Sequence, residues 1–247
     1  MRIILLRHGE SKWNLENRFT GWKDVGLTSN GEKEAKFAAN QLLNHDYKIN
    51  SIYTSLLKRA IETTDIVAKK ILFPENKIKY EWRLNERHYG ALQGLNKSET
   101  AAKYGEEQVQ IWRRSFDTPP PLLKKDDKRH PSFIKKFSSI NNEDLPSGES
   151  LKMVIERLSP FWDKYFEDIK SKRNSHLIVA HSNSLRAIVK ILENLSNKEI
   201  VRVNIPTGVP LVYTIGESNK ILDKKYLIDD MALQKKQDLI INQGKIK

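Results

Sequence analysis

Short apolar runs alternate along this 247-residue chain with longer segments whose apolar residues recur at helical spacing. Strands alternating with amphipathic helices are typical of a mostly parallel sheet covered by helices on both faces. The sequence therefore predicts an α/β fold with a three-layer α/β/α arrangement. The predicted strands are residues 2–7, 49–54, 78–84, 176–180 and 209–215, and the predicted helices are about 29–42, 55–71, 98–114, 149–170 and 184–194.

Two of the predicted strands end in a histidine. The apolar run 3–6 is followed by Arg7, His8 and Gly9, and the run 177–180 is followed by His181. Open α/β sheets bind ligands just outside the carboxyl ends of their strands. The two histidines would converge if these strands were neighbours in the sheet, but the order of the strands cannot be read from the sequence.

Further polar side chains follow other predicted strands. Arg59 lies at the start of the helix after strand 49–54, and Glu86 lies in the polar segment 82–90. Taken alone, Arg59 is typical of a surface residue and Glu86 of an ion pair. Together with the two histidines they supply what phosphoryl transfer to histidine requires: an imidazole nucleophile, cations for the phosphoryl oxygens and a carboxyl group to move a proton.

Composition excludes several chemistries. The chain has no cysteine, which excludes disulfides, thiolate nucleophiles and cysteine-ligated zinc. No histidine pair has metal-ligand spacing, so we expect no metal. The net charge of +12 indicates an anionic partner, either nucleic acid or a small acidic metabolite. No nucleic-acid-binding motif is present, which favours the metabolite.

We expect a single domain over residues 1–247, since neither an internal repeat nor a linker is visible. Residues 118–148 are rich in Pro, Lys, Asp, Ser and Asn and predict a surface insertion. The basic segment 231–247 is expected to form a C-terminal tail. There is no apolar run long enough to span a membrane and no signal-peptide pattern at the start, so a cytoplasmic location is expected.

Several motifs resemble those of one enzyme family. The sequence Leu-Arg-His-Gly-Glu-Ser at 6–11 resembles the signature of the histidine phosphatase superfamily. Nearly the whole chain is similar to the cofactor-dependent phosphoglycerate mutase family within it. This similarity lies in residues 13–14, 16–22, 82–90, 92–97, 112–115, 204–208 and 242–245.

The resemblance implies roles for individual residues. His8 would be the nucleophile that carries a phosphoryl group, and Glu86 would be the general acid and base. Phosphoryl oxygens would be held by Arg7, Asn14, Arg59 and His181. The remaining substrate contacts, to the carboxylate and the second phosphate, would come from Thr20, Gly21, Tyr89, Lys97, Arg113, Arg114, Ser182 and Asn183.

The family interconverts 3-phosphoglycerate and 2-phosphoglycerate, an isomerase reaction of glycolysis and gluconeogenesis. The resemblance thus implies priming by 2,3-bisphosphoglycerate without a metal. It also implies that the C-terminal segment is mobile and covers the pocket, and that the protein forms a homodimer or homotetramer. A bisphosphoglycerate synthase or phosphatase of the same superfamily is the alternative, and a nucleic-acid-binding protein is a more remote one.

One position departs from the family pattern. The family typically has glycine after the second histidine, where this chain has Ser182. Glycine permits positive φ and a close approach of the backbone to a phosphate. The departure leaves the balance among mutase, phosphatase and synthase activities open.

Overall fold

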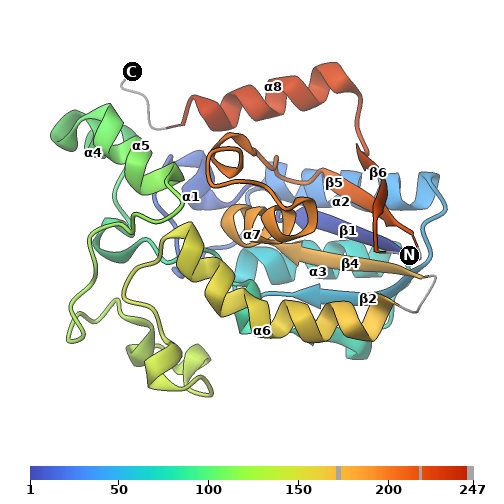
Figure 1. The fold of residues 1–247 in the computed structure, drawn as a ribbon, viewed down its shortest axis with the longest axis horizontal. Helices are drawn as coiled ribbons and strands as arrows, with labels where there is room; N and C mark the ends of the chain where they lie inside the picture. Colours follow the sequence, from blue (N-terminus) through green and yellow to red (C-terminus); the bar gives the residue numbers. More distant parts are fainter. Residues whose placement is uncertain (171–173, 217–218, 244–247) are drawn as a thin grey trace.

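The protein is built around one six-stranded sheet in the order β3-β2-β4-β1-β5-β6 (Figure 1). It is described by a computed structural model that covers residues 1–170, 174–216 and 219–243. The first four strands in this order are parallel, and β5 and β6 are antiparallel to their neighbours. The predicted mostly parallel sheet is confirmed. The strands are β1 (Arg2–Arg7), β2 (Ile49–Thr54), β3 (Ile78–Tyr80), β4 (Ser175–Ala180), β5 (Pro210–Ile215) and β6 (Ile221–Tyr226).

Helices cover both faces of the sheet, which confirms the three-layer prediction (Figure 1). Helices α6 and α7 pack on one face, where Leu158 and Ile188 belong to the larger apolar core. Helices α2 and α3 pack on the other face, where Leu42 and Val67 belong to a second core. The helices are α1 (Lys12–Leu15), α2 (Ser29–Asn44), α3 (Lys58–Lys70), α4 (Lys97–Tyr104), α5 (Glu106–Arg114), α6 (Leu151–Lys170), α7 (Ser182–Glu193) and α8 (Asp230–Ile241).

The central strands β1 and β4 explain why the two histidines meet. The side chains of residues 3–6 are completely buried, because helices cover this strand from both sides. Strand β1 pairs in parallel with β4, and Arg7 lies opposite Ala180 in the register. The backbone N–H of His8 donates to the carbonyl of Ala180 at 3.0 Å. His8 and His181 therefore leave the sheet side by side at the carboxyl ends of their strands.

Two predicted elements are shorter than the sequence pattern suggests. The predicted helix 98–114 is divided into α4 and α5 at Gly105, whose φ of +86° does not fit a right-handed helix. The predicted strand 78–84 ends at Tyr80. The Glu81 side chain accepts a hydrogen bond from the Arg83 backbone N–H and caps a short 3-10 turn, Trp82–Leu84.

The segment 118–148 is held to the body of the protein by its own small core. It contains three 3-10 turns, Pro131–Phe133, Lys135–Phe137 and Asn142–Asp144. Phe137, with Ile140 and Leu145, packs around Trp22. The centroids of the Trp22 and Phe137 rings lie 4.9 Å apart. The expected surface insertion is thus anchored by buried aromatic and aliphatic side chains. Its lysines are exposed.

The C-terminal part of the chain contains two elements that the sequence did not predict. Strand β6 is an edge strand with exposed residues 222–225, so it lacks the apolar alternation that marks a half-buried strand. Most of the expected tail 231–247 belongs to helix α8, which lies over the top of the molecule in Figure 1 and has no fully buried side chain. Residues 244–247 of that expected tail lie outside the described residues.

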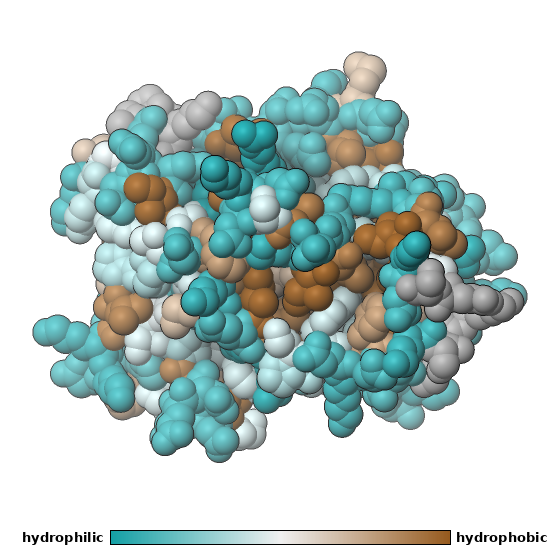
Figure 2. Space-filling view, viewed as in Figure 1, coloured by the Kyte–Doolittle hydropathy of each residue, from teal (hydrophilic) through white to brown (hydrophobic). Residues whose placement is uncertain are grey.

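The outer surface is mostly polar. In Figure 2 hydrophilic residues cover most of the visible face, and apolar side chains form small areas among them. No helix in the part of the chain that the structure describes is long and apolar enough to cross a membrane.

Candidate active site

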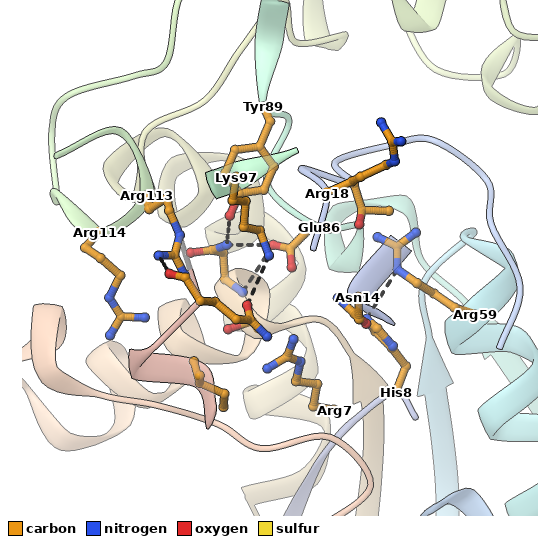
Figure 3. A pocket seen from close by; sticks show the side chains of 15 residues that line it. Arg7, His8, Asn14, Arg18, Arg59, Glu86, Tyr89, Lys97, Arg113 and Arg114 are labelled. Atoms are coloured by element: carbon orange, nitrogen blue, oxygen red, sulfur yellow. Dashed lines mark hydrogen bonds between the residues drawn. The ribbon is translucent and has the colours of Figure 1, made fainter. Parts of the chain in front are cut away.

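A pocket opens at the carboxyl ends of β1 and β4, with His8 at its base (Figure 3). Charged and polar side chains make up most of its lining, which suits a small polar ligand. Most residues predicted to form the site line it. Of the predicted set, His181 and Gly21 are not among the lining residues, and they contact the side chains of His8 and Arg59 from outside the pocket. The predicted lining residues are Arg7, His8, Asn14, Thr20, Arg59, Glu86, Tyr89, Lys97, Arg113, Arg114, Ser182 and Asn183.

His8 is held as a neutral imidazole of one tautomer. Its Nδ1 lies 2.7 Å from the carbonyl oxygen of Gly9, which only accepts, so Nδ1 carries the proton. Its Nε2 accepts a hydrogen bond from Arg59 Nε at 3.2 Å. Burial lowers the pKa of His8 well below its ordinary value, and the charges of Arg59 and Arg7 lower it further. Nε2 therefore carries no proton near neutral pH, and its lone pair can act as a nucleophile once it gives up the hydrogen bond from Arg59.

His181 packs directly against His8. The two ring centroids lie 4.9 Å apart. The Nε2 of His181 is 2.7 Å from the Ser55 hydroxyl, which also accepts a hydrogen bond from the Leu57 backbone N–H. The predicted helix 55–71 begins later, at Lys58, and Ser55 precedes it in contact with His181. Burial, Arg59 and His8 lower the pKa of His181 well below its ordinary value, so this imidazole is also neutral.

Arg7 and Arg59 bring two buried cations to the base of the pocket. Arg7 donates to the carbonyl of Ile205 at 2.8 Å, and Arg59 donates to the carbonyls of Gly21 and Lys23. The pKa of Arg59 is lowered to about 10, chiefly by burial, so the guanidinium stays charged at neutral pH. These backbone contacts fix both guanidinium groups beside His8, where an anion would offset their charge.

Glu86 faces the same space from the segment after β3. Its Oε1 accepts three hydrogen bonds, from the backbone N–H groups of Arg87 and Asn183 and from the Asn183 side-chain amide at 2.9 Å. The amide also lies 3.4 Å from the Tyr89 hydroxyl. With three donors on Oε1, Oε2 is the oxygen left to exchange a proton with a ligand.

A second group of cations, Lys97, Arg113 and Arg114, lies on the opposite side of the pocket (Figure 3). Arg114 is held by the carbonyls of Val201 and Val203. Burial lowers the pKa of Lys97 well below its ordinary value, and Arg113 and Arg7 lower it further. Within the described residues none of these three cations forms an ion pair with a carboxylate, so this end of the pocket is built for an anionic ligand.

Comparison with known proteins assigns the chain to a family. The family model described as "Histidine phosphatase superfamily (branch 1)" matches residues 3–125 and 122–224. The chain belongs to the histidine phosphatase superfamily. A curated protein, the 2,3-bisphosphoglycerate-dependent phosphoglycerate mutase of Treponema denticola, is 49% identical over 247 residues, which is 100% of both chains.

Solved structures show the same fold for this member of the superfamily. A mycobacterial glucosyl-3-phosphoglycerate phosphatase has a TM-score of 0.69 and 20% identity, with 91% of this chain and 96% of that chain covered. A putative alpha-ribazole-5'-P phosphatase from Escherichia coli has a TM-score of 0.68 and 18% identity, with 93% and 96% covered. At these identities the likeness supports the fold and not a shared substrate.

Three pocket residues of this superfamily member were not predicted: Arg18, Ile240 and Gln243. The side-chain carbonyl of Gln243 accepts a hydrogen bond from Lys97 Nζ at 3.0 Å, and its backbone carbonyl accepts one from Arg113. Gln243 thus places two neutral oxygens on the second group of cations. The resemblance implies a C-terminal segment over the pocket, but it does not identify Gln243, whose contact with Lys97 joins residues 146 positions apart.

Ser182 adopts a conformation that does not require glycine. It is the first residue of α7, and the non-glycine residues with positive φ in the described ranges do not include it. It is partly buried and lines the pocket. Its φ therefore lies outside the region that favours glycine, and the serine differs from the family's glycine here by its Cβ and its hydroxyl.

The free energy of unfolding is expected to fall as the pH is lowered from 7 to 5. Burial lowers the pKa of His88 to about 3, and it also depresses the pKa values of His8 and His181. Below about pH 6.5 the unfolded chain binds protons that the folded chain refuses, so each of these groups removes up to about 1.4 kcal/mol per pH unit. Urea denaturation at pH 7, 6 and 5 measures the slope.

His88→Gln is the informative variant for this slope, and His45→Gln is its matched control. His88 is completely buried, whereas His45 is exposed at the C-terminal end of α2. The His88 variant should lose stability less steeply with falling pH than the parent, and the His45 variant should match the parent. An unchanged slope in the His88 variant would contradict the assignment.

Proposed function

We propose that this protein is a 2,3-bisphosphoglycerate-dependent phosphoglycerate mutase that interconverts 3-phosphoglycerate and 2-phosphoglycerate through a phosphohistidine on His8. The observation that carries the proposal is the 49% identity over the full length of both chains to a curated enzyme of that name. The geometry supports it, because a neutral imidazole, a carboxylate and two separate groups of cations face one pocket.

The pocket residues suit a ligand with an anionic group at each end. Arg7, Arg59 and His8 would hold the phosphoryl group to be transferred, with help from Asn14 and His181. At the other end Lys97, Arg113 and Arg114 would hold a carboxylate or a second phosphate, for which arginine forks are well shaped. Contacts to the part of the ligand between its two anionic groups would come from Thr20, Gly21, Tyr89, Ser182 and Asn183. When bound, 2,3-bisphosphoglycerate supplies the phosphoryl group that loads His8.

The chain's own residues account for the transfer in both directions. In the loaded enzyme the Glu86 carboxylate takes the proton from the free hydroxyl of 3-phosphoglycerate, and that oxygen bonds to the phosphorus as the bond from phosphorus to His8 Nε2 breaks. His8 Nε2 then forms a bond to the other phosphorus while the bond from that phosphorus to its glycerate oxygen breaks. Glu86 Oε2 returns the proton to this oxygen, and 2-phosphoglycerate leaves a reloaded His8. Arg7 and Arg59 offset the charge on the phosphoryl oxygens throughout.

A direct assay tests the function. Purified protein is incubated with 3-phosphoglycerate and a trace of 2,3-bisphosphoglycerate, and the formation of 2-phosphoglycerate and inorganic phosphate is followed. We expect 2-phosphoglycerate to form and to require the trace compound. Phosphate release without 2-phosphoglycerate would replace the mutase by a phosphatase. In a second incubation, to which an acyl-phosphate donor is added, net accumulation of 2,3-bisphosphoglycerate would indicate a synthase.

The proposal includes an assembly and a location. We propose one domain over residues 1–247, a homodimer or homotetramer, a cytoplasmic location, and no metal, nucleic-acid or membrane partner. Light scattering on the protein as it elutes from a size-exclusion column measures the molar mass of the assembly. Salt-sensitive binding of RNA or DNA without turnover of phosphoglycerate would overturn the proposal in favour of a nucleic-acid-binding protein.

Ser182→Gly is expected to leave the reaction balance almost unchanged. The Ser182 hydroxyl makes no hydrogen bond to the described residues, and the helical backbone does not need glycine. The ratio of 2-phosphoglycerate formed to phosphate released should change by less than about threefold. The measurement is the same assay with both products quantified. A tenfold or larger change would mean that the serine itself sets the balance.

A further inference from the structure

Arg186 is a buried cation with an unusual set of partners. It lies on α7 and is 1% exposed. One guanidinium nitrogen donates to the side-chain oxygen of Asn183 at 2.9 Å, and another donates to the carbonyl of Ile200 at 2.8 Å. No carboxylate in the described part of the chain forms an ion pair with it. Burying an unpaired charge is costly, so the contact with Asn183 calls for an explanation beyond packing.

The contact determines which end of the Asn183 amide faces the pocket. A guanidinium can only donate, so it can bind only the Asn183 oxygen. With the oxygen bound to Arg186, the Asn183 nitrogen points the other way, toward Glu86 Oε1 at 2.9 Å and the Tyr89 hydroxyl at 3.4 Å. A reversed amide would place an oxygen against the Glu86 carboxylate and leave Arg186 without this acceptor.

The hydrogen bond from Arg186 to Asn183 matters most when Glu86 is protonated. An ionised carboxylate only accepts, so it favours the amide nitrogen by itself. In the proposed reaction Glu86 alternates between the ionised and the protonated form, and the protonated form carries a donor that no longer enforces this orientation. Burial and the charge of Arg114 lower the pKa of Arg186, but its N–H groups can only donate to the Asn183 oxygen, so Arg186 can fix the amide whichever form Glu86 takes.

We propose that Arg186 is a positioning residue that acts through Asn183 to hold the Glu86 carboxyl group in place during proton transfer. This inference rests on the proposed function, in which Glu86 is the general acid and base. Arg186 is not a catalytic residue, because it does not line the pocket.

The same guanidinium has a second, purely structural contact. Its Ile200 partner belongs to the 3-10 turn Ile200–Arg202, and the neighbouring carbonyls of Val201 and Val203 hold Arg114. Loss of that anchor alone would disturb Arg114 and weaken substrate binding, which would raise KM. Loss of the Asn183 contact would slow the proton transfer, which would lower kcat. The two roles therefore have different kinetic consequences.

The test is Arg186→Met, compared with Arg186→Lys and with Arg202→Met as the matched control. Methionine has a side chain of similar length but no donor, whereas lysine keeps the charge on a single donor nitrogen. Arg202 is exposed on the turn that Arg186 contacts. We expect Arg186→Met to lower kcat for 3-phosphoglycerate by roughly 10- to 100-fold, with KM within about twofold. Lysine should restore part of the loss, and Arg202→Met should match the parent.

A double-mutant cycle tests the route through Asn183. In an Asn183→Ala background, Arg186→Met should lower kcat by less than about twofold more, because the amide that it orients is gone. Fully additive losses, an unchanged kcat in a folded Arg186→Met protein, or a rise in KM alone would each overturn the inference. If Arg186→Met does not fold, Arg186→Lys in the two backgrounds provides the same comparison.

A spectroscopic arm is independent of turnover. The side-chain amide of Asn183 is assigned in ¹⁵N-labelled protein by its loss in Asn183→Ala. Its protons should exchange slowly in the parent and much faster in Arg186→Met. Equal exchange in the two proteins would overturn the positioning role whatever the activity. A parent enzyme that makes no 2-phosphoglycerate, but shows the expected exchange, would overturn the proposed function and leave the amide contact established.

Discussion

Replacement of His8 by asparagine is expected to lower kcat on the order of a million-fold, the scale seen when an enzyme loses its nucleophile. Asparagine matches part of the imidazole shape, but it has no ring nitrogen with a free lone pair to form a bond to phosphorus. The same variant should take up no acid-labile phosphate from radiolabelled 2,3-bisphosphoglycerate. Both results are measured on purified protein, by the mutase assay and by counting the label retained on the protein.

His45→Asn is the matched control for this experiment. His45 is exposed at the end of α2 and is not one of the residues that line the pocket. It should keep the parent rate and the parent labelling. If His8→Asn retained either mutase activity or acid-labile label, the phosphohistidine on His8 would be wrong, whatever reaction the protein performs.

Glu86→Gln is expected to lower kcat by about 10²- to 10⁴-fold, the usual contribution of a positioned general acid and base. Glutamine retains an oxygen for the three N–H groups that converge on Oε1, so the local structure should persist. It cannot exchange a proton at the second position. KM for 3-phosphoglycerate should change little, since Lys97 and Arg113 hold the ligand elsewhere. Steady-state kinetics separates the two parameters.

Glu81→Gln controls for the loss of a carboxylate near the same loop. Glu81 caps the turn Trp82–Leu84, pairs with Arg83 and does not line the pocket. It should keep kcat within about twofold of the parent. A Glu86→Gln enzyme with the parent kcat would remove Glu86 from the proton transfer, and with it the reason for the positioning role of Arg186.

The parts of the site that lie at strand ends could be predicted from the sequence. An apolar run followed by histidine marks a buried strand that delivers a side chain to the ligand-binding edge of the sheet. This reasoning places His8, His181, Arg59 and Glu86, and the resemblance adds their individual roles. What it could not supply was the pairing of β1 with β4, because strand order depends on contacts between residues more than 170 positions apart.

The individual contacts that the C-terminal segment makes with the pocket were beyond prediction. Gln243 follows a helix that has no fully buried residue, so no apolar stripe marked where that helix would dock. The break at Gly105 was missed for a related reason. The residues on both sides are good helix formers, and only a positive φ separates the two helices.

The loop that carries His8 is packed against α2 through two glycines. A Cβ built on Gly9 would lie 2.2 Å from the carbonyl oxygen of Gly31, and a Cβ built on Gly31 would lie 2.1 Å from that of Glu10. Real Cβ atoms do not approach backbone oxygens so closely, and overpacking of this kind typically costs about 1–3 kcal/mol.

This contact restricts which residues can replace Gly9 and Gly31. Even alanine at either position would push the loop and the helix apart, and with them the nitrogen that must attack phosphorus. A library that randomises Gly9 and Gly31 independently should therefore return glycine at both sites among its active clones. Alanine at either one should survive selection only where a second change elsewhere moves the first turn of α2 outward.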